Sequence, residues 1–187
     1  MTENELLKSL KLKSKEIMSE DKLYHDFAHA MGVFNNVQEL LKYEGANRLV
    51  LLTAALFHDI ARGKDKHGAV AALEVEEILG NINEFPKELI GHVSRIIRAH
   101  DSFQFKFDER LFSDADKMDA FNELGVIRSF MMYAQEGKTL QEACNKYIKI
   151  IERFYSNLYT PTAKQLAKKD YEKTHQFALK LIESYDI

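Results

Sequence analysis

Residues 51–63 of the chain, LLTAALFHDIARG, decide its fold. The stretch opens with seven residues of which six are apolar, and such a run at helical length indicates a buried helix. It then continues into an adjacent His58 and Asp59, before Gly63 and the polar segment 62–68, RGKDKHG. The sequence therefore predicts that two titratable side chains lie on the last turn of a buried helix, beside an exposed connection.

Helices are predicted along most of the chain. Glycine (8 residues) and proline (2 residues) are scarce, and no stretch alternates regularly between apolar and polar residues, so strands are difficult to place. Gly45 is expected to close the second helix in a left-handed conformation, and Thr160 to cap the last helix before Pro161. Helical periodicity predicts helices at about 4–18, 26–43, 46–61, 68–79, 86–100, 109–135 with a break, 138–156 and 161–185. The predicted fold class is all-α.

Length and composition favour one domain. With 187 residues, 45% of them hydrophobic, the chain is long enough for one sizeable core and too short for a second independent core. We expect a single-domain helical bundle over residues 1–187, with a core at about 20–135 and C-terminal helices at about 138–185 packing on it.

The charge balance excludes several classes of partner. The 26 Lys and Arg residues against 29 Asp and Glu give a net charge of -3, so no overall positive field would attract a nucleic acid polymer or an anionic membrane. The N-terminal segment is too charged for a secretory signal, and the apolar stretch 49–57 is far shorter than the roughly 18 to 20 residues needed to span a bilayer. Cys144 is the only cysteine, which excludes an intrachain disulfide. A cytoplasmic protein is expected.

The burial of His58 and Asp59 needs a physical reason. A buried polar group without a partner costs about 1–3 kcal/mol. A metal ion is one efficient partner, because it favours the ionised carboxylate and the neutral imidazole that ligation requires. Hydrogen bonding at the helix end is the alternative explanation for an isolated His-Asp pair, and both stay open at this point.

Further potential ligands occur on either side. Upstream, His25 and His29 are spaced i, i+4 on one helical face. Downstream, Asp114, Asp116 and Asp119 fall within six residues among apolar neighbours, so at least one carboxylate is expected to face inward and to need a cation. Mixed imidazole and carboxylate ligands suit a catalytic divalent ion, whereas a closed structural zinc site would be expected to use cysteines.

The order His29, then adjacent His58 and Asp59, then Asp116 resembles the HD superfamily of metal-dependent phosphohydrolases. The signature of that superfamily is a distant His, a His-Asp pair and a later Asp. The resemblance extends over about residues 20–185 and is most similar to the bacterial stand-alone hydrolases of the superfamily. The segments that carry it are HDFAHAMGV (25–33), LLTAALFHDIA (51–61), IIRAHDSF (96–103), SDADKMDAFNELGVIR (113–128) and TPTAKQLAKKDYEKTHQFALKLI (160–182).

The resemblance implies a set of metal ligands, and one divalent ion (Mn, Mg, Co, Ni or Fe) would be bound by His29, His58, Asp59 and Asp116. Asp116 is preferred over Asp114 because residues 115–118, Ala-Asp-Lys-Met, reproduce the context of the family's last ligand. His25 is a lesser candidate than His29, because Val33 follows His29 at the family's distance. One position departs from the pattern: a basic residue usually precedes that valine, and Gly32 stands there instead, so a substrate contact is expected to be lost.

The implied reaction is attack of metal-bound water on phosphorus, with Asp59 and His100 as catalytic residues. Arg62, Lys64, His67 and Arg128 are the predicted substrate contacts. His100 could protonate a leaving oxygen or bind phosphate, with a helix-end cap as the alternative. For the loop cations, Arg62 and Lys64 among them, a solvated surface is the alternative.

The resemblance also bounds the substrate and the competing functions. We expect a phosphorylated small molecule, most plausibly a nucleotide, with a homodimer as one option for assembly. A cyclic-nucleotide phosphodiesterase and a non-catalytic nucleotide- or metal-sensing module are the alternatives. A di-iron oxygenase is disfavoured, because Ile60, Ala61 and Arg62 follow Asp59 where that group has a His-Asp-x-x-Glu extension.

Overall fold

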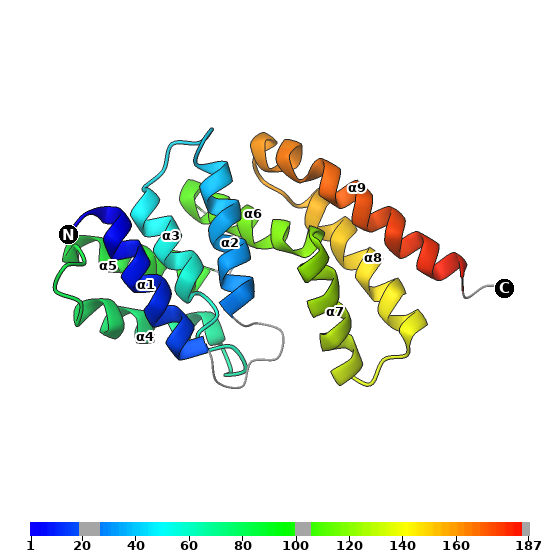
Figure 1. Cartoon of the computed structure of the whole chain (residues 1–187), viewed down its shortest axis with the longest axis horizontal. Coiled ribbons are helices and arrows are strands. Elements are labelled where there is room, and N and C mark those ends of the chain that lie inside the picture. The colour runs from blue at the N-terminus through cyan, green and yellow to red at the C-terminus, as the bar shows by residue number, and fades with distance from the viewer. Residues whose placement is uncertain (19–26, 100–105, 185–187) are drawn as a thin grey trace.

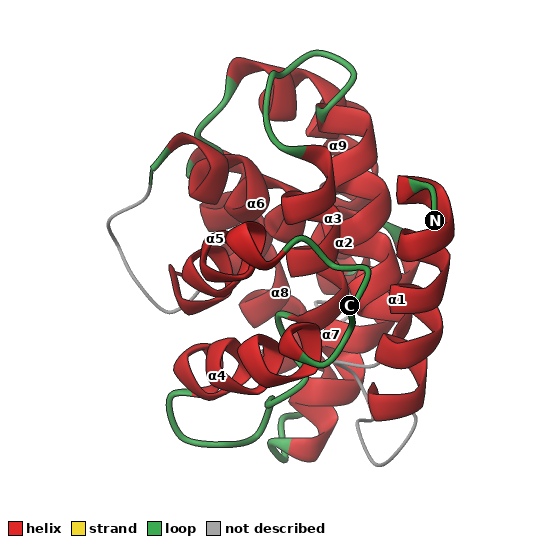
Figure 2. Ribbon diagram, turned by 90° about the vertical axis from the view of Figure 1, so that its left-hand side faces the viewer, coloured by secondary structure: helices red, strands yellow, loops and turns green. Residues whose placement is uncertain are grey.

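The computed structural model of the chain describes residues 1–18, 27–99 and 106–184. Within these ranges the regular structure is helical and contains no strand, as Figure 2 shows, which confirms the predicted all-α fold. The elements are α1 (Glu3–Met18), α2 (Phe27–Leu40), α3 (Arg48–Phe57), α4 (His67–Gly80), α5 (Lys87–Ala99), α6 (Phe107–Met118), the 3₁₀ helix η1 (Asp119–Phe121), α7 (Glu123–Gln135), α8 (Leu140–Ser156) and α9 (Pro161–Glu183).

Helix α3 lies at the centre of the first six helices and is buried along nearly its whole length. Every residue from Leu49 to Phe57 is buried, and the helix packs against α1, α2, α5 and α6. Asn47 caps its N-terminus by accepting a hydrogen bond from the Val50 N–H at 3.0 Å. The quoted apolar run therefore forms the core of this part of the molecule, as predicted.

The end of α3 differs from the prediction. The helix was expected to continue to about residue 61, but it ends at Phe57, with His58 as the C-cap and turns up to Gly63. Gly63 has a φ of 95°, a conformation that favours glycine. The prediction for Gly45 is wrong: α2 ends at Leu40, and among the described glycines only Gly63 and Gly137 have positive φ.

Helix α6 connects two groups of helices (Figure 1). It contacts α2, α3 and α5 on one side and α8 and α9 on the other, and α8 and α9 form a long antiparallel pair towards the C-terminus. The break predicted within 109–135 occurs at η1. Asn122 then caps α7 by accepting from the Gly125 N–H at 2.8 Å. No helix within the described residues is both long and apolar enough to cross a membrane.

Asp114 ties α6 to the start of α9. This fully buried carboxylate accepts hydrogen bonds from the Tyr159 N–H at 2.7 Å, the Thr160 N–H at 2.9 Å and the Thr160 hydroxyl at 2.8 Å. The Thr160 hydroxyl in turn accepts from the Ala163 N–H at 3.1 Å, and Pro161 occupies the first turn, which confirms the predicted cap. The Asp114 carboxylate thus connects α6 to the start of α9 and has a structural role.

A pH-dependent contribution to stability is expected from Asp108, where α6 meets α5. Burial alone would raise the pKa of Asp108, but hydrogen bonds from His92 and Arg95 outweigh it and lower the pKa. The contribution is therefore fully present above the ordinary Asp pKa of about 3.9 and is lost as the pH falls through the lower pKa of the folded chain. In urea unfolding, Asp108→Asn should be less stable than wild type at pH 5, and the difference should shrink below about pH 4. A difference that stays constant down to pH 2.5, or that also appears for the exposed Asp65→Asn, would contradict this assignment.

Candidate metal centre

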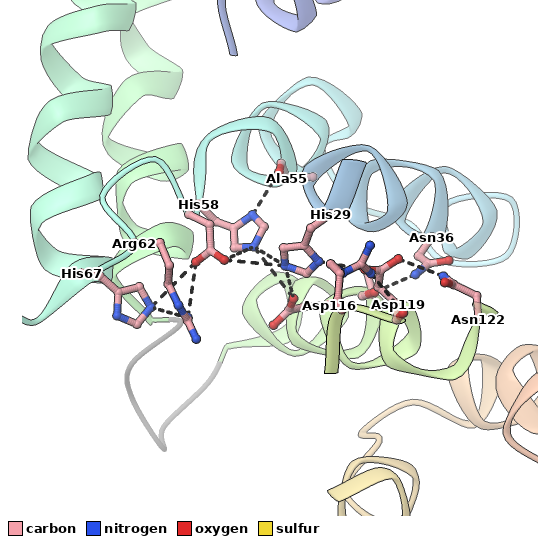
Figure 3. Close-up of polar contacts among 12 residues, drawn as sticks. His29, Asn36, Ala55, His58, Arg62, His67, Asp116, Asp119 and Asn122 are labelled. Atoms are coloured by element: carbon pink, nitrogen blue, oxygen red, sulfur yellow. Dashed lines mark hydrogen bonds and ion pairs between the residues drawn. The ribbon is translucent and has the colours of Figure 1, made fainter. Parts of the chain in front are cut away.

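Three elements bring imidazole and carboxylate groups to one place, as Figure 3 shows. His29 comes from α2, His58 and Asp59 from the end of α3, and Asp116 from α6. One donor atom from each of His29, His58 and Asp59 lies within 4.8 Å of the others. All three of these residues are buried, whereas the Asp116 side chain is 21% exposed. The cluster is therefore enclosed by protein on the α3 side and open at Asp116.

The distances centre on the Nε2 atom of His29. It lies 3.2 Å from Nε2 of His58, 3.4 Å from Oδ1 of Asp116 and 3.7 Å from Oδ2 of Asp59. Nε2 of His58 lies 3.8 Å from Oδ2 of Asp59 and 3.9 Å from Oδ1 of Asp116. Donor atoms that share one divalent ion at about 2.1 Å lie roughly 3–4 Å apart. The spacing and the chemistry of these four side chains therefore fit a divalent metal ion.

Both imidazoles are oriented by hydrogen bonds on the side away from the cluster. Nδ1 of His58 donates to the Ala55 carbonyl at 3.0 Å, and Nδ1 of His29 donates to Oδ2 of Asp119 at 2.8 Å. Each ring therefore turns Nε2 inward, as metal-binding histidines do when a hydrogen-bond acceptor holds their other ring nitrogen. The ring of Phe112 packs edge-on against His58 at 5.4 Å between centroids.

The electrostatics of the cluster favour a positive charge. Burial alone would lower the pKa of His29, but hydrogen bonds and charge from Asp116 and Asp119 outweigh it and raise the pKa to about 10. In the metal-free chain the His29 imidazolium thus balances the surrounding carboxylates. A bound cation would supply that charge instead, because a ligand histidine must be neutral.

Asp59 joins the cluster to a second pair of side chains. Its carboxylate is 1% exposed, and Oδ1 lies 3.6 Å from Nη1 of Arg62 and 3.8 Å from Nε2 of His67. Arg62 and His67 also contact each other at 3.1 Å. Lys64 points elsewhere and pairs with Glu74 at 2.5 Å. Of the predicted loop contacts, Arg62 and His67 therefore lie beside the cluster, and Lys64 does not.

Asp119 is held on the opposite side of His29. Arg128 donates to its Oδ2, and Nδ2 of Asn122 donates to its Oδ1 at 2.9 Å. Helix α2 passes close to this carboxylate at Gly32: a Cβ added there would lie 2.0 Å from Oδ1 of Asp119. Arg128, predicted as a substrate contact, is thus placed next to the cluster by an ion pair with Asp119.

The cluster opens into a cavity of about 260 Å³. The lining combines charged side chains, from three of the four cluster residues and from Asp119, Arg62 and Arg128, with apolar side chains from α7 and α8. The described residues that line the cavity are His29, Asp59, Arg62, Asp116, Asp119, Ala120, Gly125, Arg128, Ser129, Met132, Tyr133, Ile150 and Phe154.

Sequence reasoning identified only part of this set. His29, His58, Asp59 and Asp116 are brought together, whereas His100 and His25 lie outside the described residues. The apolar lining of the cavity, which includes Met132, Tyr133, Ile150 and Phe154, was not identified from the sequence. On a helix, an apolar residue that lines a cavity has the same spacing as one that fills a core.

Comparison with known proteins places these residues in a wider context. The HD domain family model matches residues 26–121, a range that includes all four clustered side chains. Among curated proteins, the uncharacterized protein YpgQ of Bacillus subtilis is 26% identical over 183 residues, which cover 90% of this chain and 86% of YpgQ.

Solved structures share the fold over nearly the whole chain. The crystal structure of Bacillus subtilis YpgQ in complex with ADP has a TM-score of 0.81 at 24% identity and covers 98% of this chain and 97% of that chain. The Lin1889 protein of Listeria innocua gives 0.80 at 23% identity, with 100% and 99% covered. An HD-superfamily hydrolase of Bacillus thuringiensis gives 0.75 at 23% identity, with 99% of each chain covered. The similarity therefore includes the C-terminal helices as well as the region of the cluster.

Proposed function

The chain belongs to the HD domain family, and we propose that it is a metal-dependent phosphohydrolase that acts on a phosphorylated small molecule, most plausibly a nucleotide. The observation that carries the proposal is the convergence of two Nε2 atoms, 3.2 Å apart, with two carboxylates that each lie 3.4–3.9 Å from both of them, beside a cavity. A divalent ion held by His29, His58, Asp59 and Asp116 would polarise a phosphoryl oxygen and lower the pKa of water near it.

The side chains around the cluster provide the other groups that phosphoryl transfer requires. Arg62 and Arg128 both line the cavity, and an arginine guanidinium group can hold two phosphoryl oxygens at once. Asp116 is the most exposed carboxylate of the cluster, so its oxygens can orient the attacking water and accept a proton from it. Asp59 lies deeper and keeps Arg62 close to the reacting phosphate.

The apolar lining of the cavity supports a nucleotide rather than a phosphate ester without a ring. Met132, Ile150 and Phe154 contribute apolar surface to the same cavity as the charged side chains, which suits a ligand that carries both a phosphate and a flat ring. The complex of YpgQ with ADP, in a protein that shares this fold, is consistent with such a ligand.

Hydrolysis assays with the purified protein test the proposal. Phosphate release is measured for nucleotides and phosphomonoesters, and ring opening is followed by chromatography for cyclic dinucleotides, each with added manganese, magnesium, cobalt or nickel, and metal content is measured in parallel. We expect turnover of at least one nucleotide that depends on the added ion and stops with a chelator. Absence of both bound metal and turnover with every substrate would instead favour a non-catalytic helical module.

Truncation of Phe154 should distinguish binding of the base from binding of the phosphate. Removing this ring takes away part of the apolar surface, and a loss of about 1.4 kcal/mol of binding would raise KM for a nucleotide about tenfold with little change in kcat. KM for a phosphomonoester without a base should stay the same. Leu140→Ala, at the exposed start of the same helix, is the control. Equal KM values for Phe154→Ala and wild type would argue against a ring-binding role for α8.

A further inference from the structure

We propose that Asp119 is a positioning residue, which fixes the His29 imidazole in the tautomer that offers Nε2 to the metal ion, and that Gly32 makes this contact possible. The inference rests on the proposed function only in assuming that a divalent ion binds the cluster. Asp119 is not one of the four proposed ligands. Its Oδ2 accepts from Nδ1 of His29 at 2.8 Å, on the face of the ring that points away from the cluster.

The reason lies in the chemistry of neutral imidazole. A neutral ring has one N–H, and the nitrogen that carries the proton cannot bind a metal ion. A carboxylate next to Nδ1 keeps the proton there and increases the basicity of Nε2. For His58 the same task falls to the Ala55 carbonyl, which is part of helix α3 and cannot move independently. For His29 it falls to a side chain that must itself be held in place.

Two side chains hold the Asp119 carboxylate. Arg128 donates to Oδ2 and Asn122 donates to Oδ1 at 2.9 Å, and the Asp119 side chain is only 3% exposed. The oxygen that faces His29 therefore cannot rotate away without breaking both contacts. Asp119 lies on η1, a short 3₁₀ helix between α6 and α7, so this segment sets the distance between the carboxylate and the ring.

Gly32 leaves the space that the carboxylate fills. It lies one turn after His29 on α2, and a Cβ at this position would be 2.0 Å from Oδ1 and 2.7 Å from Cγ of Asp119. A methyl group would thus displace the carboxylate from His29 without altering either side chain. Gly125 leaves space for the Asp119 backbone in the same way, because a Cβ there would lie 2.2 Å from the Asp119 carbonyl oxygen. Two glycines from different helices therefore leave the space that Asp119 occupies.

Manganese affinity of the full-length chain, measured by isothermal titration calorimetry, tests the inference without reference to turnover. Asp119→Ala and Gly32→Ala should each weaken Mn²⁺ binding about ten- to a hundredfold. Asp119→Asn should recover most of the affinity, because its amide oxygen can still accept from Nδ1. The matched control is Gly91→Ala, a helix glycine around which no atom lies within 4 Å of an added Cβ; its affinity should equal that of wild type.

The tautomer itself is read from the ¹⁵N shifts of histidine-labelled protein loaded with diamagnetic zinc. Wild type should show the His29 proton on Nδ1 and the metal on Nε2. The opposite assignment would overturn the inference, and it decides the matter even if a variant fails to fold. Unchanged Mn²⁺ affinity in folded Gly32→Ala or Asp119→Ala would overturn it as well. A wild-type chain that binds no divalent ion would refute the proposed function instead, so the two failures are distinguishable.

Discussion

Replacing Asp116 by alanine is expected to abolish metal-dependent phosphate release, a loss of at least about 10³-fold, while the chain stays folded. Oδ1 of Asp116 lies 3.4 Å from His29 Nε2 and 3.9 Å from His58 Nε2, so the substitution removes one anionic ligand from the proposed centre. The side chain is 21% exposed and lines the cavity, and its loss leaves no void in the core. Initial rates with a saturating nucleotide and metal content after gel filtration measure the effect.

The matched control for this prediction is Asp65→Ala. Asp65 is an exposed carboxylate in the turn before α4, so its removal changes the net charge equally without touching the cluster. Asp65→Ala should keep the wild-type rate and metal content, and both variants should keep the helical circular dichroism spectrum. A folded Asp116→Ala that retains more than about a tenth of the wild-type rate would contradict the proposed ligand set.

The sequence correctly predicted that the His-Asp pair lies at the end of a buried helix, because this signal is local, but it placed the pair on the last turn, whereas His58 is the C-cap and Asp59 lies in the turn that follows. An apolar run that ends in two titratable residues, followed by Gly63, indicates both a buried helix and its end. The exact end was missed for a physical reason: Ile60 and Ala61 are buried as well, so the apolar pattern continues through the turn after α3. Hydrophobic spacing reports burial, and it cannot distinguish a helix from a tight turn when both are buried.

The aspartates at positions 114, 116 and 119 show what the sequence alone does not reveal. Charge and spacing indicate that at least one carboxylate of Asp114, Asp116 and Asp119 faces inward, but they do not assign roles. The resemblance to the HD superfamily selected Asp116. The structure gives Asp114 backbone donors from residues 159 and 160, and gives Asp119 a contact with His29, 90 positions away in the chain. Such partners are fixed by tertiary packing and leave no local pattern.

Gly32 stands where the resemblance predicts a basic residue, and the sequence alone does not explain the difference. The missing basic residue was expected to cost a substrate contact. In the structure the same position accommodates the Asp119 carboxylate, and that carboxylate in turn pairs with Arg128 beside the cavity. Arg128 on α7 thus places a positive charge next to the cluster, near the α2 position at which the basic residue is missing.

Replacing Asp114 by alanine should lower the stability of the chain and leave metal binding unchanged, the opposite of Asp116→Ala, although the two residues are only two positions apart. The substitution leaves three donors of residues 159 and 160 without their acceptor in a buried region. At about 1 kcal/mol or more for each, the loss is about 3 kcal/mol, which corresponds to a fall in the melting temperature of roughly 6–12 °C for a chain of this size. Metal affinity at a temperature where the variant is folded should equal that of wild type.

Asp114→Asn is the informative companion of this variant. Burial raises the pKa of Asp114, and the hydrogen bonds from Tyr159 and Thr160 lower it only in part, so the buried negative charge is itself unfavourable. Asparagine removes that charge and keeps one acceptor oxygen, and it should therefore destabilise the chain less than alanine does. Thermal unfolding followed by circular dichroism gives the order wild type, Asp114→Asn, Asp114→Ala. Loss of bound metal from folded Asp114→Ala at an unchanged melting temperature would instead indicate that Asp114, and not Asp116, is the metal ligand.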